Sequence, residues 1–78
     1  MMTHYLKCES VYFQEVERGK KKFELRKNDR DFKVGDLVCL QEVSNGVHTG
    51  RCLPTLEIRY VLAGGVYGLS EDYCIFNW

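Results

Sequence analysis

The sequence predicts a small, mainly β (α+β) domain with one short N-terminal helix and about five strands. Apolar and charged residues alternate over Lys22–Arg26 and Leu56–Tyr60, and Asn45-Gly46 is a strong turn signal. Alternation places every second side chain on one face of a strand, which is typical of a sheet covered on one side. Because a small sheet loses its exposed edges by curling, we expect residues 1–78 to form a single barrel-like domain.

The first elements are predicted to be a strand over Tyr5–Cys8 and a helix of about two turns over Ser10–Arg18. The serine that begins the helix is a favourable N-cap. Tyr12 and Val16 are four residues apart and share the apolar face of this helix, and Phe13 lies beside them. Gly19 follows at the position where a left-handed backbone ends a helix.

The strand over Lys22–Arg26 is expected to be half-buried. In this interpretation Phe23 and Leu25 face the core, while Glu24 and Arg26 lie on the other face.

Three more strands are predicted at Leu37–Val43, Leu56–Leu62 and Tyr73–Trp78. Asn45-Gly46 predicts a two-residue hairpin because both residues tolerate positive φ. The strand that returns from this hairpin is expected to bend between Thr49 and Pro54, and the connections between strands are expected to be hairpin-like.

Length and composition exclude several classes of protein. A chain of 78 residues is too short for a Rossmann fold, a TIM barrel or a two-domain enzyme. Its 45% apolar and 28% charged residues are typical of a folded domain rather than a disordered one. No apolar run is long enough to cross a membrane, and no apolar run follows a basic start at the N-terminus. We therefore expect a cytoplasmic protein without a membrane partner.

The four cysteines predict neither a metal site nor a disulfide framework. They are widely separated and form no Cys-x-x-Cys pair, which structural zinc sites normally need. In a reducing cytosol they are expected to be free, half-buried thiols. No metal and no cofactor is predicted. The residues concerned are Cys8, Cys39, Cys52 and Cys74.

The charges cancel overall, but their distribution is uneven. The chain has 11 basic and 11 acidic residues, and the segment Arg18–Lys33 holds eight of the former and three of the latter. A locally basic segment on a neutral domain indicates an anionic partner at one place rather than a general polyanion binder. The alternative is a solvated hairpin with some ion pairs.

The segment Gly19-x-Lys21-x-x-Glu24-x-Arg26 carries the most chemical information. Glu24 and Arg26 project from the same strand face, and the preceding turn brings Lys21 beside them. Arg26 would offer a fork for a phosphate or a base edge, Lys21 a mobile charge, and Glu24 an acceptor for a base amino group. A surface ion-pair triplet explains the same residues without a ligand.

This segment resembles the signature of the ASCH (activating signal cointegrator homology) domain, in the PUA-like superfamily. Further residues extend the resemblance over nearly the whole chain, toward a small bacterial and phage-associated branch. They are His4-x-Leu6-Lys7, Tyr12-Phe13, Arg26–Phe32, Val34-Gly35-Asp36, Glu42, Thr49-Gly50-Arg51 and Ile58-x-Tyr60-Val61-Leu62.

The resemblance implies a PUA-like pseudo-β-barrel of about five strands with one or two helices. It also implies an RNA or nucleotide partner, bound in a cleft between the first helix and the barrel. The positions of Lys21, Glu24 and Arg26 lie in that cleft, and His4 is near it by the same resemblance. Arg30 and Lys33, in the loop that follows, are candidates for phosphate contacts.

Two other functions stay open. One branch of ASCH proteins is identified with amidohydrolases of acetylated cytidine, which use a lysine, a threonine and a glutamate. Lys21 matches the lysine, Glu24 occupies the threonine position, and the catalytic glutamate has no counterpart. The cointegrator name supports a protein-interaction module acting in transcription. The basic segment favours RNA or nucleotide binding, with a role in transcription or translation-related regulation.

Most aromatic side chains are expected in the core, and Phe32 is the best candidate for an exposed ring.

Overall fold

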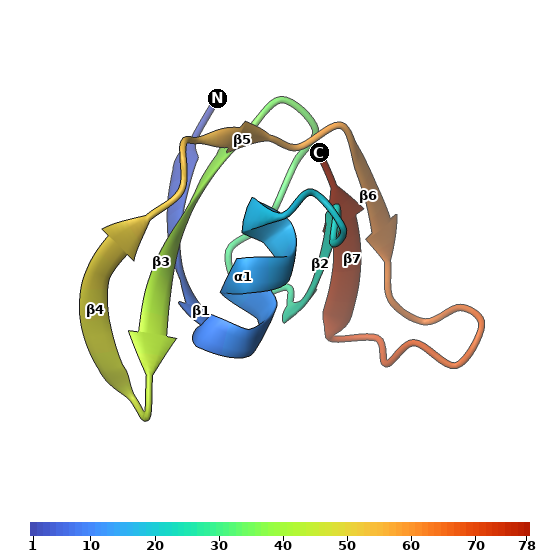
Figure 1. Ribbon diagram of the computed structural model, residues 1–78. Coiled ribbons are helices and arrows are strands. Elements are labelled where there is room, and N and C mark those ends of the chain that lie inside the picture. The colour runs from blue at the N-terminus through green and yellow to red at the C-terminus, as the bar shows by residue number, and fades with distance from the viewer.

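The computed structural model describes residues 1–78 and arranges seven strands in two separate sheets around one core (Figure 1). The first sheet has the order β1-β3-β4, with the short β5 also paired to β3, and the second has the order β2-β7-β6. This confirms the mainly β class, but two sheets replace the expected single barrel. The elements are β1 Thr3–Glu9, α1 Ser10–Glu17, β2 Phe23–Lys27, β3 Leu37–Ser44, β4 Val47–Cys52, β5 Leu56–Glu57, β6 Tyr60–Ala63 and β7 Tyr73–Asn77.

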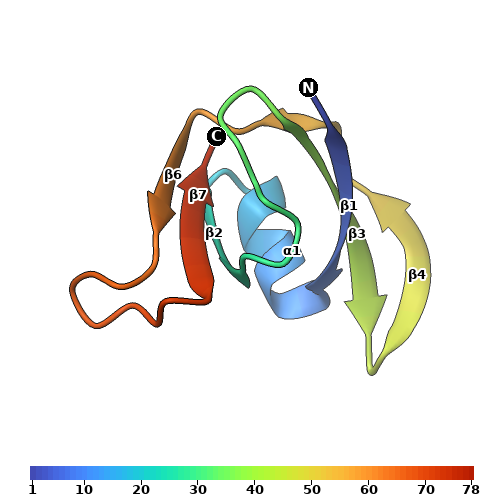
Figure 2. The ribbon, with the colours of Figure 1, turned by 180° about the vertical axis from the view of Figure 1, so that it is seen from behind.

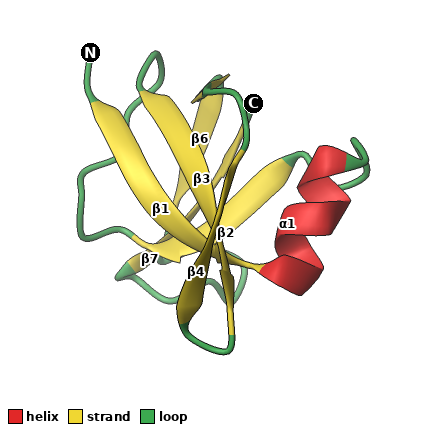
Figure 3. Ribbon diagram, turned by 60° about the vertical axis from the view of Figure 1, so that its left-hand side comes forward, coloured by secondary structure: helices red, strands yellow, loops and turns green.

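Strands β1 and β3 run parallel, so the expectation of hairpin-like connections throughout was wrong. Thr3 lies opposite Leu37 and Glu9 opposite Val43. Parallel neighbours need a crossover, and here α1 and β2 lie between them in the chain. Figure 2 shows β1 and β3 side by side from behind, and Figure 3 shows α1 beside the strands.

Helix α1 lies close to its predicted bounds, but its first residue does not act as the cap. The N-cap is Glu9, without a side-chain hydrogen bond, while Ser10 Oγ donates to the carbonyl oxygen of Val43 at 3.3 Å. Gly19 has φ of 76°, the left-handed conformation expected after the helix. Of the three residues expected on its apolar face, Phe13 and Val16 are buried, but Tyr12 is not. Tyr12 is exposed instead and is free to line a surface site.

The predicted hairpin at Asn45-Gly46 is confirmed. Their φ angles are 52° and 78°, and the two residues join β3 to β4. Positive φ at both central positions gives a turn whose twist matches that of the flanking strands.

The segment Leu56–Leu62, predicted as one strand, is divided between the two sheets. Leu56–Glu57 pairs with β3, whereas Tyr60–Ala63 pairs with β7. Ile58, between them, is fully buried, and its N–H donates to the carbonyl oxygen of Asp36 at 2.9 Å. This buried residue holds the chain where it passes from one sheet to the other (Figure 1).

The face of β2 that is buried is the opposite of the predicted one. Glu24 is buried, with 6% of its surface exposed, while Phe23 and Leu25 are exposed to 47% and 53%. Alternation determines which residues share a face, but the register and the neighbouring sheet determine which face is inside. The charged face of β2 therefore points inward, and its apolar face points to solvent.

The core lies between the sheets and α1. Phe13, Val38, Leu40 and Phe76 are among its buried members. Phe32 is buried as well, with its ring centroid 4.8 Å from that of Phe76, so its prediction as an exposed aromatic was wrong. No helix of the chain is long and apolar enough to span a membrane.

Candidate functional site

A pocket of about 580 Å³ opens where the edge of β1 meets the edge of β2. Strand β1 ends the first sheet and β2 ends the second, so backbone hydrogen bonds do not close this seam. We call this cavity the β1–β2 pocket. Its lining residues are Lys7, Cys8, Glu9, Tyr12, Lys21, Phe23, Glu24, Leu25, Arg26, Lys27 and Tyr73.

The carboxylate of Glu24 lies in this pocket between two cations. Lys21 Nζ donates to Oε1 at 2.7 Å, and Arg26 Nε donates to Oε2 at 2.6 Å. The exposed fractions of the Lys21, Arg26 and Glu24 side chains are 18%, 25% and 7%. A carboxylate removed from water in this way needs such partners, since an unpaired buried charge is costly.

Local structure explains how these three side chains meet. Glu24 and Arg26 are two positions apart on β2 and project to the same side. Lys21 is placed by the end of α1, where its N–H and that of Lys20 both donate to the carbonyl oxygen of Glu15 at 3.0 Å. The helix end thus turns the chain so that Lys21 reaches the start of β2.

Two arginines bridge the seam between the sheets. Arg26 Nη2 donates to the carbonyl oxygen of Lys7, and Arg30 Nη1 donates to that of Tyr5 at 2.8 Å. Both acceptors belong to the free edge of β1. Side chains therefore take the place of the strand pairing that would have closed a barrel.

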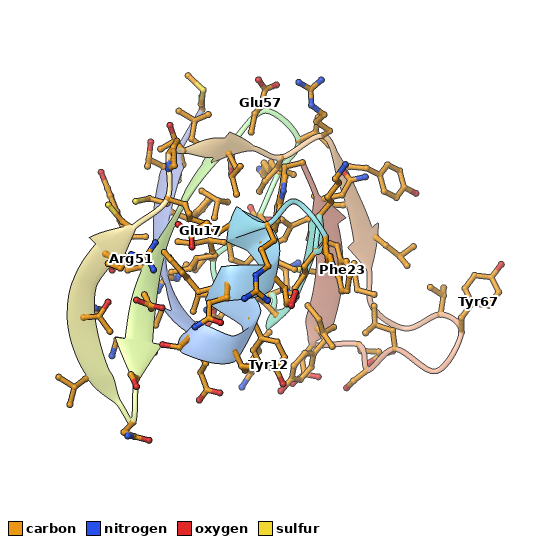
Figure 4. The ribbon with its side chains drawn as sticks, viewed as in Figure 1. Tyr12, Glu17, Phe23, Arg51, Glu57 and Tyr67 are labelled. Carbon is orange, nitrogen blue, oxygen red and sulfur yellow. The ribbon has the colours of Figure 1, made fainter.

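The pocket combines positive charge with aromatic surface. Four lysines or arginines and two glutamates line it, which leaves a surplus of two positive charges. Lys21 Nζ lies 5.1 Å from the ring centroid of Phe23 and 5.8 Å from that of Tyr12, both within range of a cation–π interaction. Both rings are labelled in Figure 4, beside α1 and at the start of β2. Tyr73 adds a third ring to the lining.

The thiol of Cys8 lies on the same wall. Burial raises the pKa of this thiol above its ordinary value, and the nearby Glu24 carboxylate raises the pKa further, against the opposing effects of Lys21 and Arg26. The thiol is therefore held protonated at neutral pH, and a protonated thiol is a poor nucleophile.

The structure brings together three of the six residues predicted for the site. Lys21, Glu24 and Arg26 line the pocket, whereas His4, Arg30 and Lys33 do not. His4 is buried, and its Nε2 donates to Asp36 Oδ2 at 2.8 Å. Arg30 is bonded to β1, as described above. Lys33 is exposed and pairs with Asp31 at 3.2 Å.

Sequence reasoning missed most of the remaining lining. Tyr12 was placed on the apolar helix face and Tyr73 in a strand, and most aromatic side chains were expected in the core, yet both tyrosines are exposed. Phe23 was assigned to the core because the inner face of β2 was inverted. Lys7 and Lys27, which also line the pocket, lie at the two strand edges and carry no spacing signal of their own.

A second group of charged residues lies outside the pocket, between α1 and β4. The buried Glu42 accepts a hydrogen bond from Thr49 Oγ1 at 2.7 Å. Arg51 forms an ion pair with Glu17 of α1, and its guanidinium lies 5.2 Å from the ring centroid of Phe13. Arg51 and Glu17 are labelled on facing elements in Figure 4. This group attaches the β3–β4 hairpin to the helix.

No group of three or more histidine, cysteine, aspartate or glutamate side chains is placed to hold a metal ion. All four cysteines are free thiols; Cys8 and Cys74 are buried, and Cys52 is exposed.

Comparison with known proteins places the chain in a family. Residues 3–78 match the family described as "Domain of unknown function (DUF3850)". The chain belongs to this family. The DUF3850 chain is also 36% identical over 74 residues to a protein of Escherichia phage P2, described as "Uncharacterized 12.9 kDa protein in GpA 3'region". That alignment covers 95% of this chain and 65% of the phage protein. The resemblance to ASCH domains stays a prediction from the residues quoted above.

Proposed function

We propose that the DUF3850 chain binds RNA, or a nucleotide-sized fragment of it, in the β1–β2 pocket. One observation carries this proposal: a buried carboxylate, Glu24, is held between Lys21 and Arg26 inside a pocket lined by aromatic rings. The arrangement supplies three kinds of contact that a nucleotide uses, namely a stacking surface, hydrogen-bonding groups and positive charge.

The size of the pocket fits such a ligand. A volume of about 580 Å³ falls within the usual range for small-molecule sites, about 300–1,000 Å³. Tyr12, Phe23 and Tyr73 offer ring faces to a base, and stacking of this kind contributes about 1–3 kcal/mol per base.

Different polar groups of the pocket can contact the base and the phosphate of a nucleotide. Carboxylate oxygens accept several hydrogen bonds, so Glu24 can receive a base amino group while it remains paired with both cations. The surplus positive charge from Lys7 and Lys27 is available for phosphate. Lys21 and Arg26 hold Glu24 in place and add to that positive field.

The resemblance to ASCH domains supports the same proposal, because Lys21, Glu24 and Arg26 are the positions it assigns to a ligand cleft. Under this proposal the protein acts in the cytoplasm, in transcription or translation-related regulation, and the phage relative fits the phage-associated branch of the resemblance. Arg30 and Lys33 would meet phosphates beyond the pocket.

The contacts of the candidate nucleophiles in the pocket favour binding over amide hydrolysis. The Lys21 ammonium is engaged with Glu24, and the neighbouring thiol of Cys8 is held protonated. Lys21 Nζ is therefore bound to a carboxylate rather than free to attack, and a protonated thiol is a poor nucleophile. Turnover of acetylated cytidine that depends on Lys21 would reverse this preference.

The test is a fluorescence-anisotropy titration with short single-stranded and hairpin RNAs at about 50 and 200 mM salt. Competition by ribonucleoside monophosphates measures binding of the fragment alone. Lys21→Ala is expected to weaken RNA binding roughly tenfold, because Glu24 then loses one of the two cations that hold it in place. Lys20→Ala is the matched control, because Lys20 is exposed and does not line the pocket.

Circular dichroism establishes that each variant is folded before its affinity is compared. Lys21→Gln provides a second variant that keeps a donor for Glu24 while it removes the charge. The proposal is wrong if folded wild-type protein binds neither RNA nor mononucleotide at the lower salt concentration. It is also wrong if Lys20→Ala and Lys21→Ala weaken binding equally.

A further inference from the structure

We propose that single-stranded RNA continues from the β1–β2 pocket onto the outer face of the β2-β7-β6 sheet, where its bases stack on exposed aromatic rings. This inference rests on the proposed function, which it extends from a nucleotide in a pocket to a strand on a surface. It assigns a partner to a sheet face that no other part of the chain covers.

The composition of this outer face is unusual. Residues directly opposite one another in a sheet point to the same side, so the register identifies its members. The outer face consists of Phe23, Leu25 and Lys27 of β2, Tyr73, Ile75 and Asn77 of β7, and Tyr60 and Leu62 of β6. A solvated sheet face is normally polar at such positions, but only Lys27 and Asn77 are polar here. The helix packs on β1 and β3 and leaves this face open.

Three aromatic side chains are distributed over the outer face. Phe23 and Tyr60 both lie opposite Asn77, one on each side of β7, so their strands are about 10 Å apart. Tyr73 lies at the other end of β7, opposite Lys27. Exposed rings at separate strand positions can each accept one base, and such stacking tolerates any base sequence.

The outer face is continuous with the pocket. Phe23, Leu25, Lys27 and Tyr73 belong to the outer face and also line the β1–β2 pocket. A strand whose one nucleotide occupies the pocket therefore meets the next ring without leaving the surface. Figure 4 labels Phe23 to the right of α1, and Figure 1 shows β7 and β6 beyond β2.

Charge at one end of this face favours nucleic acid over an apolar protein partner. Lys22 precedes Phe23, Arg59 precedes Tyr60, and both cations are exposed. They flank the two rings and can neutralise phosphates between stacked bases. At the opposite end the charge is mixed, because the Asp72 carboxylate lies near Lys27. Phosphates are therefore expected at the Lys22–Arg59 end.

The test separates the outer face from the pocket through Tyr60, which belongs to the face but does not line the pocket. Tyr60→Ala is compared with Tyr5→Ala, a matched control on the other sheet. The two tyrosines are exposed to 61% and 59%. The probes are a labelled single-stranded RNA of about eight nucleotides, a duplex of the same length, and adenosine monophosphate.

Tyr60→Ala is expected to weaken binding of the single-stranded RNA by between about fivefold and 150-fold, the equivalent of one lost stacked base. Its affinity for the monophosphate should equal that of the wild type. Tyr5→Ala should change neither affinity, and the duplex should bind more weakly than the single strand because its bases are already stacked.

Each remaining outcome is decisive. If the single strand binds and Lys21→Ala weakens it while Tyr60→Ala does not, the outer face is not used and the pocket proposal stands. If Tyr60→Ala weakens the single strand but Lys21→Ala weakens it no more than Lys20→Ala does, the face is used and the pocket proposal fails. If sedimentation velocity shows a dimer that Tyr60→Ala dissociates, the face is a protein interface and this inference is overturned.

Discussion

Arg26 Nε donates a hydrogen bond to Glu24 Oε2 at 2.6 Å, although the two residues lie on one strand, two positions apart. The period of the strand alone places both side chains on the inner side of β2. Lys21 completes the group only because the chain turns after α1. The three residues do form ion pairs, as in the alternative of a surface triplet, but they line a pocket and their central carboxylate is buried.

Removal of that carboxylate should destabilise the domain. Glu24→Ala leaves Lys21 and Arg26 facing each other without their shared partner. We expect the free energy of unfolding to fall by about 2 kcal/mol. Removal of one partner from a fully buried ion pair costs more, about 3–5 kcal/mol, but here both cations retain some contact with water. Urea denaturation at neutral pH measures the change.

Glu15→Ala provides the control, since Glu15 pairs with the exposed Arg18 at 3.2 Å. An exposed pair of this kind contributes about 0–1 kcal/mol. Equal losses in the two variants would show that Glu24 has no special structural role. For the same reason, Lys21→Ala and Arg26→Ala are expected to cost more stability than substitutions in an open cleft would.

The sequence was sufficient for the local elements and for the core of the site. The Asn45-Gly46 hairpin, the helix and the grouping of Lys21, Glu24 and Arg26 each depend on spacing within a few residues. The inner face of β2 was not predictable in this way, because the apolar Phe23 and Leu25 would be predicted as the buried residues of any isolated strand. Only the pairing of β2 with β7, a contact between residues distant in the chain, decides that Glu24 points inward.

The parallel pairing of β1 with β3 also escaped local reasoning. No turn signal marks a crossover, and the apolar pattern of Leu37–Val43 fits either direction. The role of His4 follows from that pairing. Parallel register brings His4 opposite Val38, beside the turn that holds Asp36. A histidine that resemblance placed near the ligand is thus a buried partner of an aspartate.

The His4–Asp36 contact should make the free energy of unfolding depend on pH in the acidic range. The hydrogen bond from His4 lowers the pKa of the Asp36 carboxyl below its ordinary value, and the N–H groups of Met2 and Lys33 lower it further against the effect of burial. Because the pKa of Asp36 is lower in the folded than in the unfolded state, its ionised carboxylate stabilises the fold when the pH is above the unfolded pKa of about 3.9. This contribution is lost as the pH falls through the folded pKa. The difference in unfolding free energy between wild type and Asp36→Asn should therefore shrink below about pH 4.

Urea denaturation between about pH 2 and pH 7 follows that difference. The ionised aspartate is the feature under test, and the asparagine keeps its size. A difference that stays constant over the whole range would contradict the assignment of the charge to this contact.

Cys8 should react slowly with alkylating reagents. Because burial and the Glu24 carboxylate raise the pKa of this thiol, little thiolate is present near pH 8. Cys52 is exposed and should react first with iodoacetamide, with mass spectrometry to locate each label. In the Glu24→Gln variant one cause of the raised pKa is absent, so alkylation of Cys8 should become faster. Labelling of Cys8 as early as Cys52 in the wild type would contradict its placement in the pocket wall.

Arg51 should hold the β3–β4 hairpin against the helix. Its guanidinium pairs with Glu17 and lies over the ring of Phe13, although about half of the side chain is exposed. Arg51→Ala should therefore lower the free energy of unfolding by only about 0.5–1 kcal/mol. Its clearer effect should be local, as faster amide hydrogen exchange in Val47–Cys52, with β7 unchanged.

A double-mutant cycle with Glu17→Ala isolates the ion pair, since the two single effects should add to more than the double effect. Additive effects, or exchange that accelerates equally in β7, would show that the hairpin is held by other contacts.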